Sequence, residues 1–251
     1  MRSSDLFSAA ARAYAKFRPA YPDALIRFVA STAPGRDLAW DCATGNGQAA
    51  VALAPWFRRV VATDASATQL EHARSCPRVE YRLAPEAASG LDPESVDLVT
   101  AAQALHWLDL EAFYAEVRRV LKPRGVLAVW CYARCRVAPD IDRAIDWFYE
   151  ERVGRYWPPQ RVHTETGYRD LPFPFDPLPA GTWEVTAAMT REELLGYCGT
   201  WSAVAVARRS EQADPIPELA ARLAPLWPSA IERRSVTWPL ALRIGRADRS
   251  P

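Results

Sequence analysis

Two hydrophobic periods alternate along the first 130 residues of the chain. Short apolar, β-branched runs predict strands at Leu38–Ala43, Arg59–Thr63, Val79–Leu83, Val96–Ala101 and Val126–Trp130. Between them, apolar residues recur every three or four positions and predict helices at Gln48–Trp56, Ser66–Ser75 and Leu110–Leu121. Strands that alternate with helices in this way indicate βαβ units around a parallel sheet.

The pattern changes after Cys131. Pro158–Pro179 is rich in proline and aromatic residues and has no clear period, and a loop of this length in a compact domain is typical of a functional lid or cap. Around it we expect further helices at Asp140–Tyr156, Arg191–Tyr197 and Pro217–Leu226, and strands at Trp183–Ala188 and Val236–Ile244.

A glycine loop follows the first predicted strand. Gly45 and Gly47 stand two apart just before a predicted helix, where glycine lets the backbone take positive φ and approach a ligand closely. Asp41 lies on the strand before the loop, and Asp64 ends the second strand. An acid at that second position is able to accept both hydroxyls of a ribose, so the sequence predicts a nucleotide-like cofactor.

Two alternative classes of protein have to be weighed for this loop. Residues 45–50 also fit G-x-G-x-x-G/A with Asp64 at nearly the expected separation, which would indicate an NAD(P)-binding oxidoreductase. Against it, no second βαβαβ half and no hydride-transfer residues are evident. The other alternative is a non-catalytic protein that uses the same fold to bind a partner. An intact loop together with Asp64 argues against that alternative.

The composition and net charge bear on the binding partners, the chemistry and the cellular location that we expect of the protein. The 251 residues carry a net charge of +1, which gives no electrostatic footprint for nucleic acid or a membrane surface. The only lysines are Lys16 and Lys122, neither suitably placed for Schiff-base or phosphate-loop chemistry. Five scattered cysteines and an amino terminus without a hydrophobic signal core lead us to expect a cytoplasmic protein. The three histidines are too dispersed for a zinc site, and we expect no metal.

The loop sequence D-C-A-T-G-N-G at 41–47 resembles the first motif of class I S-adenosylmethionine-dependent methyltransferases. That motif is usually acid-x-Gly-x-Gly-x-Gly, and this chain has Ala43 where the first glycine is common. Five further segments resemble a small-molecule subgroup, with the methyltransferase type 11 domain, that includes trans-aconitate methyltransferase. They are YAKFRPAYP at 14–22, VVATDAS at 60–66, AQALHW at 102–107, LKPRGVLAVW at 121–130 and GTWSAV at 199–204.

The resemblance implies an α/β fold with a Rossmann-like, seven-stranded sheet, helices on both faces and the aromatic, proline-rich cap after the fifth strand. It implies a helical segment at 1–35 that covers the cofactor and a cofactor-binding core at 36–132. Residues 133–251 would supply the cap and the strands that complete the same domain. The implied cofactor is S-adenosyl-L-methionine, and the implied reaction methylates a small organic molecule. A carboxylic acid acceptor is suggested by analogy to the subgroup. We expect a monomer or a homodimer.

By the same resemblance, the cofactor contacts are Tyr14, Arg18, Asp41, Ala43, Gly45, Gly47, Asp64, Ala65, Ala84, Glu86 and Gln103. Asp41 would lie near the methionyl amino group, while Asp64 would hold the ribose. Either Ala84 or Glu86 would contact the adenine amino group. Gln103 would face the methyl-bearing sulfur. Tyr14 and Arg18 would close over the cofactor, although Arg18 is equally readable as a surface residue. Ala65 would pack on the adenine.

The acceptor side is predicted at the end of the fourth strand. His106 and Trp107 follow that strand, at the edge where ligands bind in open α/β sheets. His106 is the candidate catalytic residue, either as a general base or as a hydrogen-bond donor to the acceptor. The candidate walls of the acceptor pocket are Trp107, Trp130, Trp157 and Trp201, although about half of such residues are expected to be simple packing.

Overall fold

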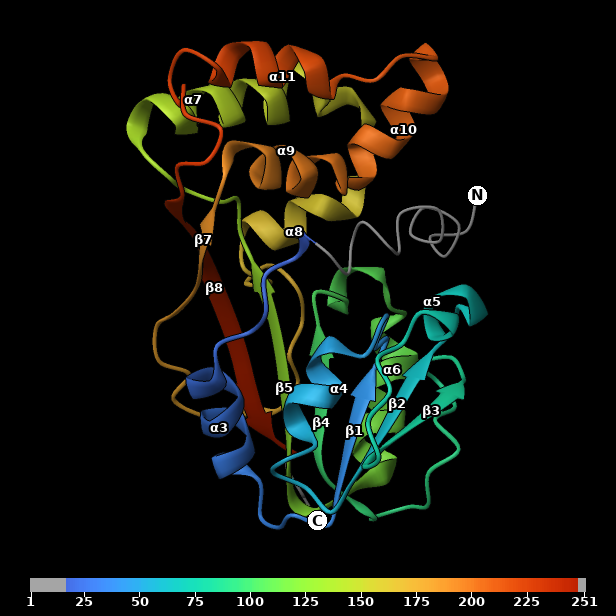
Figure 1. The fold of residues 1–251 in the computed structure, drawn as a ribbon. Helices are drawn as coiled ribbons and strands as arrows, with labels where there is room; N and C mark the ends of the chain where they lie inside the picture. Colours follow the sequence, from blue (N-terminus) through green and yellow to red (C-terminus); the bar gives the residue numbers. More distant parts are fainter. Residues whose placement is uncertain (1–16, 248–251) are drawn as a thin grey trace. The chain divides into compact units, whose positions relative to one another are not determined.

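The computed structural model describes residues 17–247, and these residues group into two units (Figure 1). The sheet unit consists of Ala20–Ala133, Val162–Trp183 and residues 240–247. The helical unit consists of residues 17–19, Arg134–Arg161 and Glu184–Pro239. The chain that follows the fifth strand therefore contributes segments to both units.

Within the described residues the sheet has eight strands, one more than the seven expected. Seven of them run in the order β3-β2-β1-β4-β5-β8-β6, and β7 pairs with β8 off this path. The bounds are β1 (Leu38–Cys42), β2 (Arg59–Asp64), β3 (Val79–Leu83), β4 (Val96–Ala102), β5 (Leu121–Tyr132), β6 (Asp176–Pro177), β7 (Trp183–Met189) and β8 (Arg234–Arg246). Pairs from β3 to β5 are parallel, and β8 is antiparallel to β5 and β6. The predicted α/β, Rossmann-like fold is confirmed.

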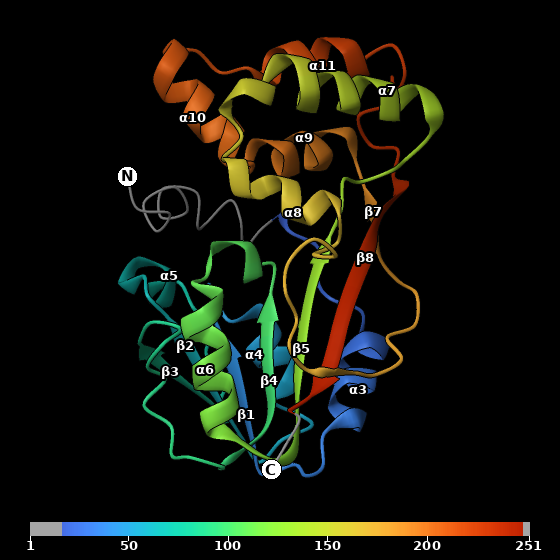
Figure 2. The ribbon, with the colours of Figure 1, turned by 180° about the vertical axis from the view of Figure 1, so that it is seen from behind.

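Helices cover both faces of the sheet. Figures 1 and 2 show α3 (Asp23–Thr32) and α4 (Gln48–Leu53) on one face and α6 (Leu110–Val120) on the other. Because both faces are covered, β1, β2 and β4 are buried along most of their length, which is why their sequences are nearly continuous apolar runs. Among the described residues, no helix is both long enough and apolar enough to cross a bilayer.

Parallel register brings the carboxyl ends of the central strands together. Cys42 of β1 pairs with Thr63 of β2, and Asp41 pairs with Thr100 of β4. Just beyond these ends begin the loop before α4, the turn into α5 (Ala67–Glu71) and the short 3-10 helix η1 (Leu105–Trp107). The candidate site is therefore confined to the loops at this edge of the sheet.

The helical unit contains α7 (Pro139–Trp147), η2 (Phe148–Arg152), η3 (Gly154–Tyr156), η4 (Pro159–Arg161), α9 (Arg191–Gly199), α10 (Ser202–Glu211) and α11 (Ile216–Leu223). Its interior is largely aromatic. Trp201 lies 5.5 Å from Tyr149 and 6.0 Å from Phe148, measured between ring centroids. A capping box of Thr190 and Glu193 starts α9, which satisfies backbone N–H groups at its first turn.

Several predicted elements differ in extent from the observed ones. The helix expected to reach Trp56 ends at Leu53. Ala54 still has a helical backbone (φ −54°, ψ −35°), but Pro55 after it has no N–H with which to continue the helical hydrogen bonds. The single helix expected over Asp140–Tyr156 breaks after Trp147 into a π-helical and a 3-10 turn. The helix expected over Ser66–Ser75 ends at Glu71. The structure also contains α8 (Val162–Glu165) in the proline-rich stretch, and α10, for which no helix was predicted.

Candidate functional site

The loop after β1 is built on left-handed backbone conformations. Ala43, Gly45 and Gly47 have φ of 52°, 58° and 81°. The Thr44 N–H donates to the Thr63 carbonyl at 2.9 Å, and the Gly47 N–H donates to the Thr44 carbonyl at 3.0 Å. Glycine takes such a φ without penalty, whereas an alanine pays for its Cβ. Ala43, at the common glycine position of the motif, therefore keeps the glycine-like backbone.

Asp64 fixes this loop from the neighbouring strand. Its Oδ2 accepts the Gly45 N–H at 2.8 Å, and its Oδ1 accepts the Ser66 N–H at 2.9 Å. Burial raises the pKa of the Asp64 carboxyl, while these two backbone donors work against the shift. Each carboxylate oxygen has a second lone pair, so the same group remains able to accept two ribose hydroxyls.

Asp41 lies beneath the loop and is only 1% exposed. Its Oδ2 accepts the Thr44 hydroxyl at 2.5 Å, and its Oδ1 accepts the Thr100 hydroxyl at 2.7 Å. Burial raises the pKa of Asp41 to about 6, although both hydroxyl donors favour the ionised form. Through these two hydrogen bonds Asp41 links β1 to the loop and to β4. Its predicted contact with a methionyl amino group stays a prediction.

Gly47 lets the Tyr81 side chain lie directly against the loop, where a side chain at position 47 would clash with it. A Cβ built at this position would lie 2.0 Å from the Tyr81 hydroxyl oxygen and 2.8 Å from two carbons of its ring. Tyr81 in turn donates its hydroxyl to the Arg74 carbonyl at 2.7 Å. At Gly45 the nearest atom to such a Cβ is 3.9 Å away. The close approach of Tyr81 therefore requires glycine at position 47 more strictly than at 45.

Three of the other predicted cofactor residues follow the ends of β2 and β3. Ala65 follows Asp64 and is exposed. The Ala84 N–H donates to the Asp64 carbonyl at 3.1 Å, which places Ala84 beside the end of β2. Glu86 accepts the Asp109 N–H at 3.1 Å through Oε1.

Gln103 supplies a buried acceptor at the end of β4. It has a φ of 56°, and its N–H donates to the Trp130 carbonyl at 2.8 Å. Its Nε2 donates to the Tyr132 carbonyl at 3.4 Å, and its buried Oε1 has no hydrogen-bond partner among the described residues. A buried acceptor without a donor is costly, so one that persists suits a cationic or N–H-bearing ligand. This oxygen, the positive-φ loop and the Asp64 carboxylate together fit a cofactor with an amine, a sulfonium and a ribose.

His106 lies on η1 with 8% of its surface exposed. Its Nδ1 is 2.9 Å from the Tyr168 hydroxyl, and its ring centroid is 4.7 Å from that of Trp107. Tyr168 was not predicted from the sequence. The only local signal was Gly167, which precedes it in the aromatic and proline-rich stretch. A single glycine does not predict a contact with a residue 62 positions away in the sequence.

The predicted acceptor tryptophans fall in different surroundings. Trp107 is half-buried beside His106, whereas Trp130 is fully buried in β5 with Tyr21 edge-on at 5.4 Å. Trp157 and Trp201 belong to the helical unit and pack 5.7 Å apart. Arg18 is also in that unit, where its Nε donates to the Thr200 hydroxyl at 3.2 Å. Tyr14 lies outside the described residues.

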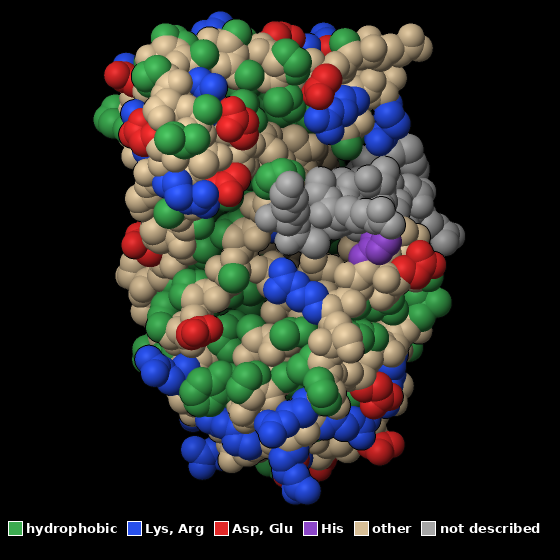
Figure 3. Space-filling view, viewed as in Figure 1, with side chains coloured by type: hydrophobic (Ala, Val, Ile, Leu, Met, Phe, Trp, Pro, Cys, Tyr) green, Lys and Arg blue, Asp and Glu red, His purple; other side chains and the backbone are tan. Residues whose placement is uncertain are grey.

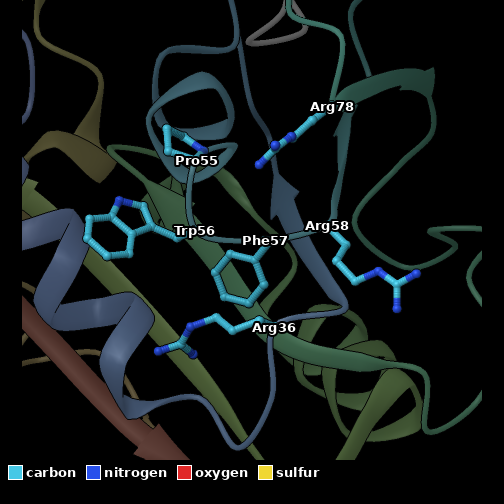
Figure 4. A pocket seen from close by; sticks show the side chains of 6 residues that line it. All are labelled: Arg36, Pro55, Trp56, Phe57, Arg58 and Arg78. Atoms are coloured by element: carbon cyan, nitrogen blue, oxygen red, sulfur yellow. The ribbon is translucent and has the colours of Figure 1, made fainter.

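A surface hollow of about 380 Å³ occurs at the opposite edge of the sheet (Figure 4). Arg36, Arg58 and Arg78 each precede the amino end of a strand, and Arg58 extends away from the rings of Trp56 and Phe57. Lys and Arg side chains gather at this lower end of the sheet unit in Figure 3. None of the predicted site residues lines the hollow, so we place the candidate site at the carboxyl edge alone.

Comparisons with known proteins agree on one activity. A family profile described as "Methyltransferase domain" matches residues 40–129. A "Putative methyltransferase" of Dictyostelium discoideum is 34% identical over 219 residues, covering 86% of this chain and 83% of that protein. A "Probable S-adenosylmethionine-dependent methyltransferase" of Saccharomyces cerevisiae is 31% identical over 157 residues, covering 57% and 54%. A solved structure from Anaeromyxobacter dehalogenans, a "Putative Type II Methyltransferase", is 47% identical with a TM-score of 0.86 and covers 92% of this chain and 98% of its own.

Replacement of Gly47 should destabilise the protein more than replacement of Gly45. Gly45→Ala meets only the left-handed φ and should cost about 1 kcal/mol of unfolding free energy, whereas Gly47→Ala also displaces Tyr81 and should cost about 3 kcal/mol. Urea unfolding of the two variants without added ligand measures both values. Equal losses would show that Tyr81 does not constrain position 47.

The buried Asp41 should make stability fall as pH rises through the acidic range. In the unfolded chain this carboxyl ionises near pH 3.8, whereas burial raises its pKa in the folded chain to about 6. The unfolded state therefore binds fewer protons between these values, and folding should lose about 3 kcal/mol from this group as pH rises from about 4 to about 6.

Asp41→Asn is the matched comparison, because it keeps the shape and does not titrate. The difference in unfolding free energy between the wild type and this variant, measured in urea at about pH 4 and about pH 7, should shift by about 3 kcal/mol in favour of the variant at the higher pH. Parallel pH profiles for the two proteins would contradict the assignment.

Proposed function

The chain belongs to the class I S-adenosylmethionine-dependent methyltransferases, and from that membership we propose that it transfers a methyl group to a small organic acid. Within the family we place it in the subgroup that includes trans-aconitate methyltransferase. The support for that placement is the order and spacing of the segments at 14–22, 60–66, 102–107, 121–130 and 199–204. S-adenosylmethionine is the cofactor that this family uses.

The residues at the carboxyl edge would hold the cofactor. When bound, S-adenosylmethionine supplies an electrophilic methyl group carried by a sulfonium cation. Asp64 would accept the ribose hydroxyls with the lone pairs that Gly45 and Ser66 leave available. Ala65 would pack against the adenine, and either Ala84 or Glu86 would meet its amino group. Gln103 would offer its buried Oε1 to the cationic part of the ligand.

Methyl transfer of this kind depends mainly on placement. The chain has to hold a nucleophilic atom of the acceptor about 3 Å from the methyl carbon, in line with the bond that breaks. A carboxylate is ionised at neutral pH and needs no base. Under this proposal His106 donates a hydrogen bond to the acceptor and does not remove a proton.

The assignment of an acid acceptor is carried by the likeness of the segments at 14–22, 60–66, 102–107, 121–130 and 199–204 to the trans-aconitate subgroup. In the sheet unit, Trp107 lies beside His106, with their ring centroids 4.7 Å apart, and we propose it as an acceptor contact. Trp130, Trp157 and Trp201 stay predictions as further acceptor residues.

The remaining parts of the proposal follow from sequence and composition. The methyltransferase relatives favour neither an NAD(P)-dependent oxidoreductase nor a non-catalytic binding protein. The net charge of +1 argues for a small acceptor in place of nucleic acid or a membrane. Five free cysteines suit a cytoplasmic location. We further propose that residues 1–35 cover the cofactor, that residues 133–251 supply the cap, and that the protein acts as a monomer or homodimer.

Cofactor binding should stabilise the protein and should depend on Asp64. S-adenosylmethionine or S-adenosylhomocysteine at about 100-fold over its dissociation constant should add roughly 2.7 kcal/mol of stability. Asp64→Asn retains a loop acceptor but loses the charge, and should weaken binding by about 1.5–3 kcal/mol. Urea unfolding with and without ligand measures the gain in stability, and calorimetric titration measures the change in affinity, with the exposed Asp92→Asn as the control. Stabilisation by NAD with no effect of either sulfur ligand would reverse the assignment.

Acceptor screening should show turnover with organic acids and little dependence on the His106 ring. We expect His106→Gln to keep most of the wild-type rate, because glutamine still donates a hydrogen bond and an ionised carboxylate needs no base. Conversion to S-adenosylhomocysteine is measured against panels of organic acids, phenols and amines. A loss of about 10²–10⁴-fold with unchanged cofactor affinity would make His106 a general base and the acceptor a proton-bearing group.

A further inference from the structure

The His106 imidazole is tied to a residue of the proline-rich stretch. Its Nδ1 lies 2.9 Å from the Tyr168 hydroxyl oxygen, inside the sheet unit. The two ring centroids are 5.8 Å apart, and Tyr168 is 0% exposed. A hydrogen bond at one ring nitrogen decides which nitrogen carries the proton in a neutral imidazole, so this contact sets what the other nitrogen does.

Tyr168 is held in place by its backbone. It has a φ of 64°, and Gly167 before it has a φ of 61°. The Tyr168 N–H donates to the His163 carbonyl at 2.8 Å, and Arg243 donates to the carbonyls of both Tyr168 and Leu171. A non-glycine residue in the left-handed region persists only where its surroundings fix it. The phenol therefore meets His106 from a fixed position.

The direction of this hydrogen bond follows from the two groups. A phenol keeps its proton at neutral pH, and the bare nitrogen of a neutral imidazole is a stronger acceptor than a phenol oxygen. We infer that Tyr168 is a positioning residue that donates its hydroxyl proton to Nδ1 of His106 and so keeps the imidazole proton on Nε2. The inference rests on the proposed function in one respect, namely that Nε2–H then serves as the donor to an anionic acceptor.

The position of the proton determines what Nε2 of His106 is able to do. A neutral His106 with its proton on Nε2 has no lone pair there and accepts no proton from an acceptor at that atom. The same N–H is suited to orient a carboxylate oxygen, because hydrogen bonds to an ionised acceptor are the stronger kind. Tyr168 thus selects hydrogen-bond donation over base catalysis at this position.

The tautomer is measured directly on the full-length protein labelled with ¹⁵N-histidine. Long-range ¹H–¹⁵N correlation spectra, taken roughly two pH units above the ordinary imidazole pKa of about 6.5, show which nitrogen of a neutral ring is protonated. The His106 signals are those lost in His106→Gln. We expect the proton on Nε2. A proton on Nδ1 in the wild type would overturn the inference without any further variant.

His163 provides an internal reference. Its Nδ1 lies 2.7 Å from Asp170 Oδ2, and an ionised carboxylate only accepts, so its neutral ring should carry the proton on Nδ1. The two histidines should therefore show opposite tautomers in one spectrum.

Tyr168→Phe and Tyr114→Phe form a matched pair. Tyr114 is another buried tyrosine, 4% exposed, whose hydroxyl donates to the Pro172 carbonyl at 2.7 Å. Tyr168→Phe should let the Nδ1-protonated form of His106 appear, and Tyr114→Phe should leave the His106 signals unchanged. An unchanged tautomer in Tyr168→Phe, or an equal change in Tyr114→Phe, would refute the role given to Tyr168.

Kinetics separate positioning from general structural support. With an acceptor found by screening, Tyr168→Phe should raise the KM for that acceptor about 10-fold with little change in kcat, as expected for a weakened hydrogen bond to an ion. Tyr114→Phe should change neither. A fall in kcat alone would contradict the donor role. The spectra need neither cofactor nor acceptor, so an absence of methyl transfer would refute the proposed function and leave the tautomer result standing.

Discussion

The carboxylate of Asp64 is the constraint on which the geometry of the site depends. One oxygen accepts the Gly45 N–H from the loop after β1, and the other accepts the Ser66 N–H from the turn after β2. Two backbone segments that are adjacent only because β1 and β2 are parallel are thereby fixed to one side chain. The loop keeps its left-handed residues because its position is determined from outside the loop as well as from within.

Asp41 completes this arrangement from below. Its carboxylate binds the hydroxyls of Thr44 and Thr100, so the same loop is anchored to β4 as well as to β2. The two acids thus differ in character, since Asp41 is fully enclosed while Asp64 retains partial exposure at the end of its strand. The less enclosed acid is the better candidate to meet a ligand, and the enclosed one contributes mainly to shaping the loop.

The sequence allowed the parallel core to be predicted because its signals are local. Runs such as Arg59–Thr63 are short and β-branched, and Gly45 and Gly47 mark a turn whose glycines are required by φ. The interior of the helical unit was less predictable, since the break after Trp147 depends on tertiary packing that no local period reports.

The His106–Tyr168 contact shows the same limit within the site. The position of His106 after β4 followed from the order of strands and motifs, but its partner comes from 62 residues further along the chain. Tyr168 reaches it through a left-handed backbone fixed by Arg243, and Arg243 lies on β8. A contact that depends on three separate segments leaves no pattern in any one of them.

The most direct test of the account is a crystal structure of the protein with S-adenosylhomocysteine. The account predicts the ribose hydroxyls within hydrogen-bond distance of the Asp64 carboxylate, the adenine against Ala65, and the Gly45–Gly47 backbone beneath the ligand. A nucleoside bound elsewhere, or an Asp64 carboxylate that contacts only Gly45 and Ser66 in the complex, would contradict it.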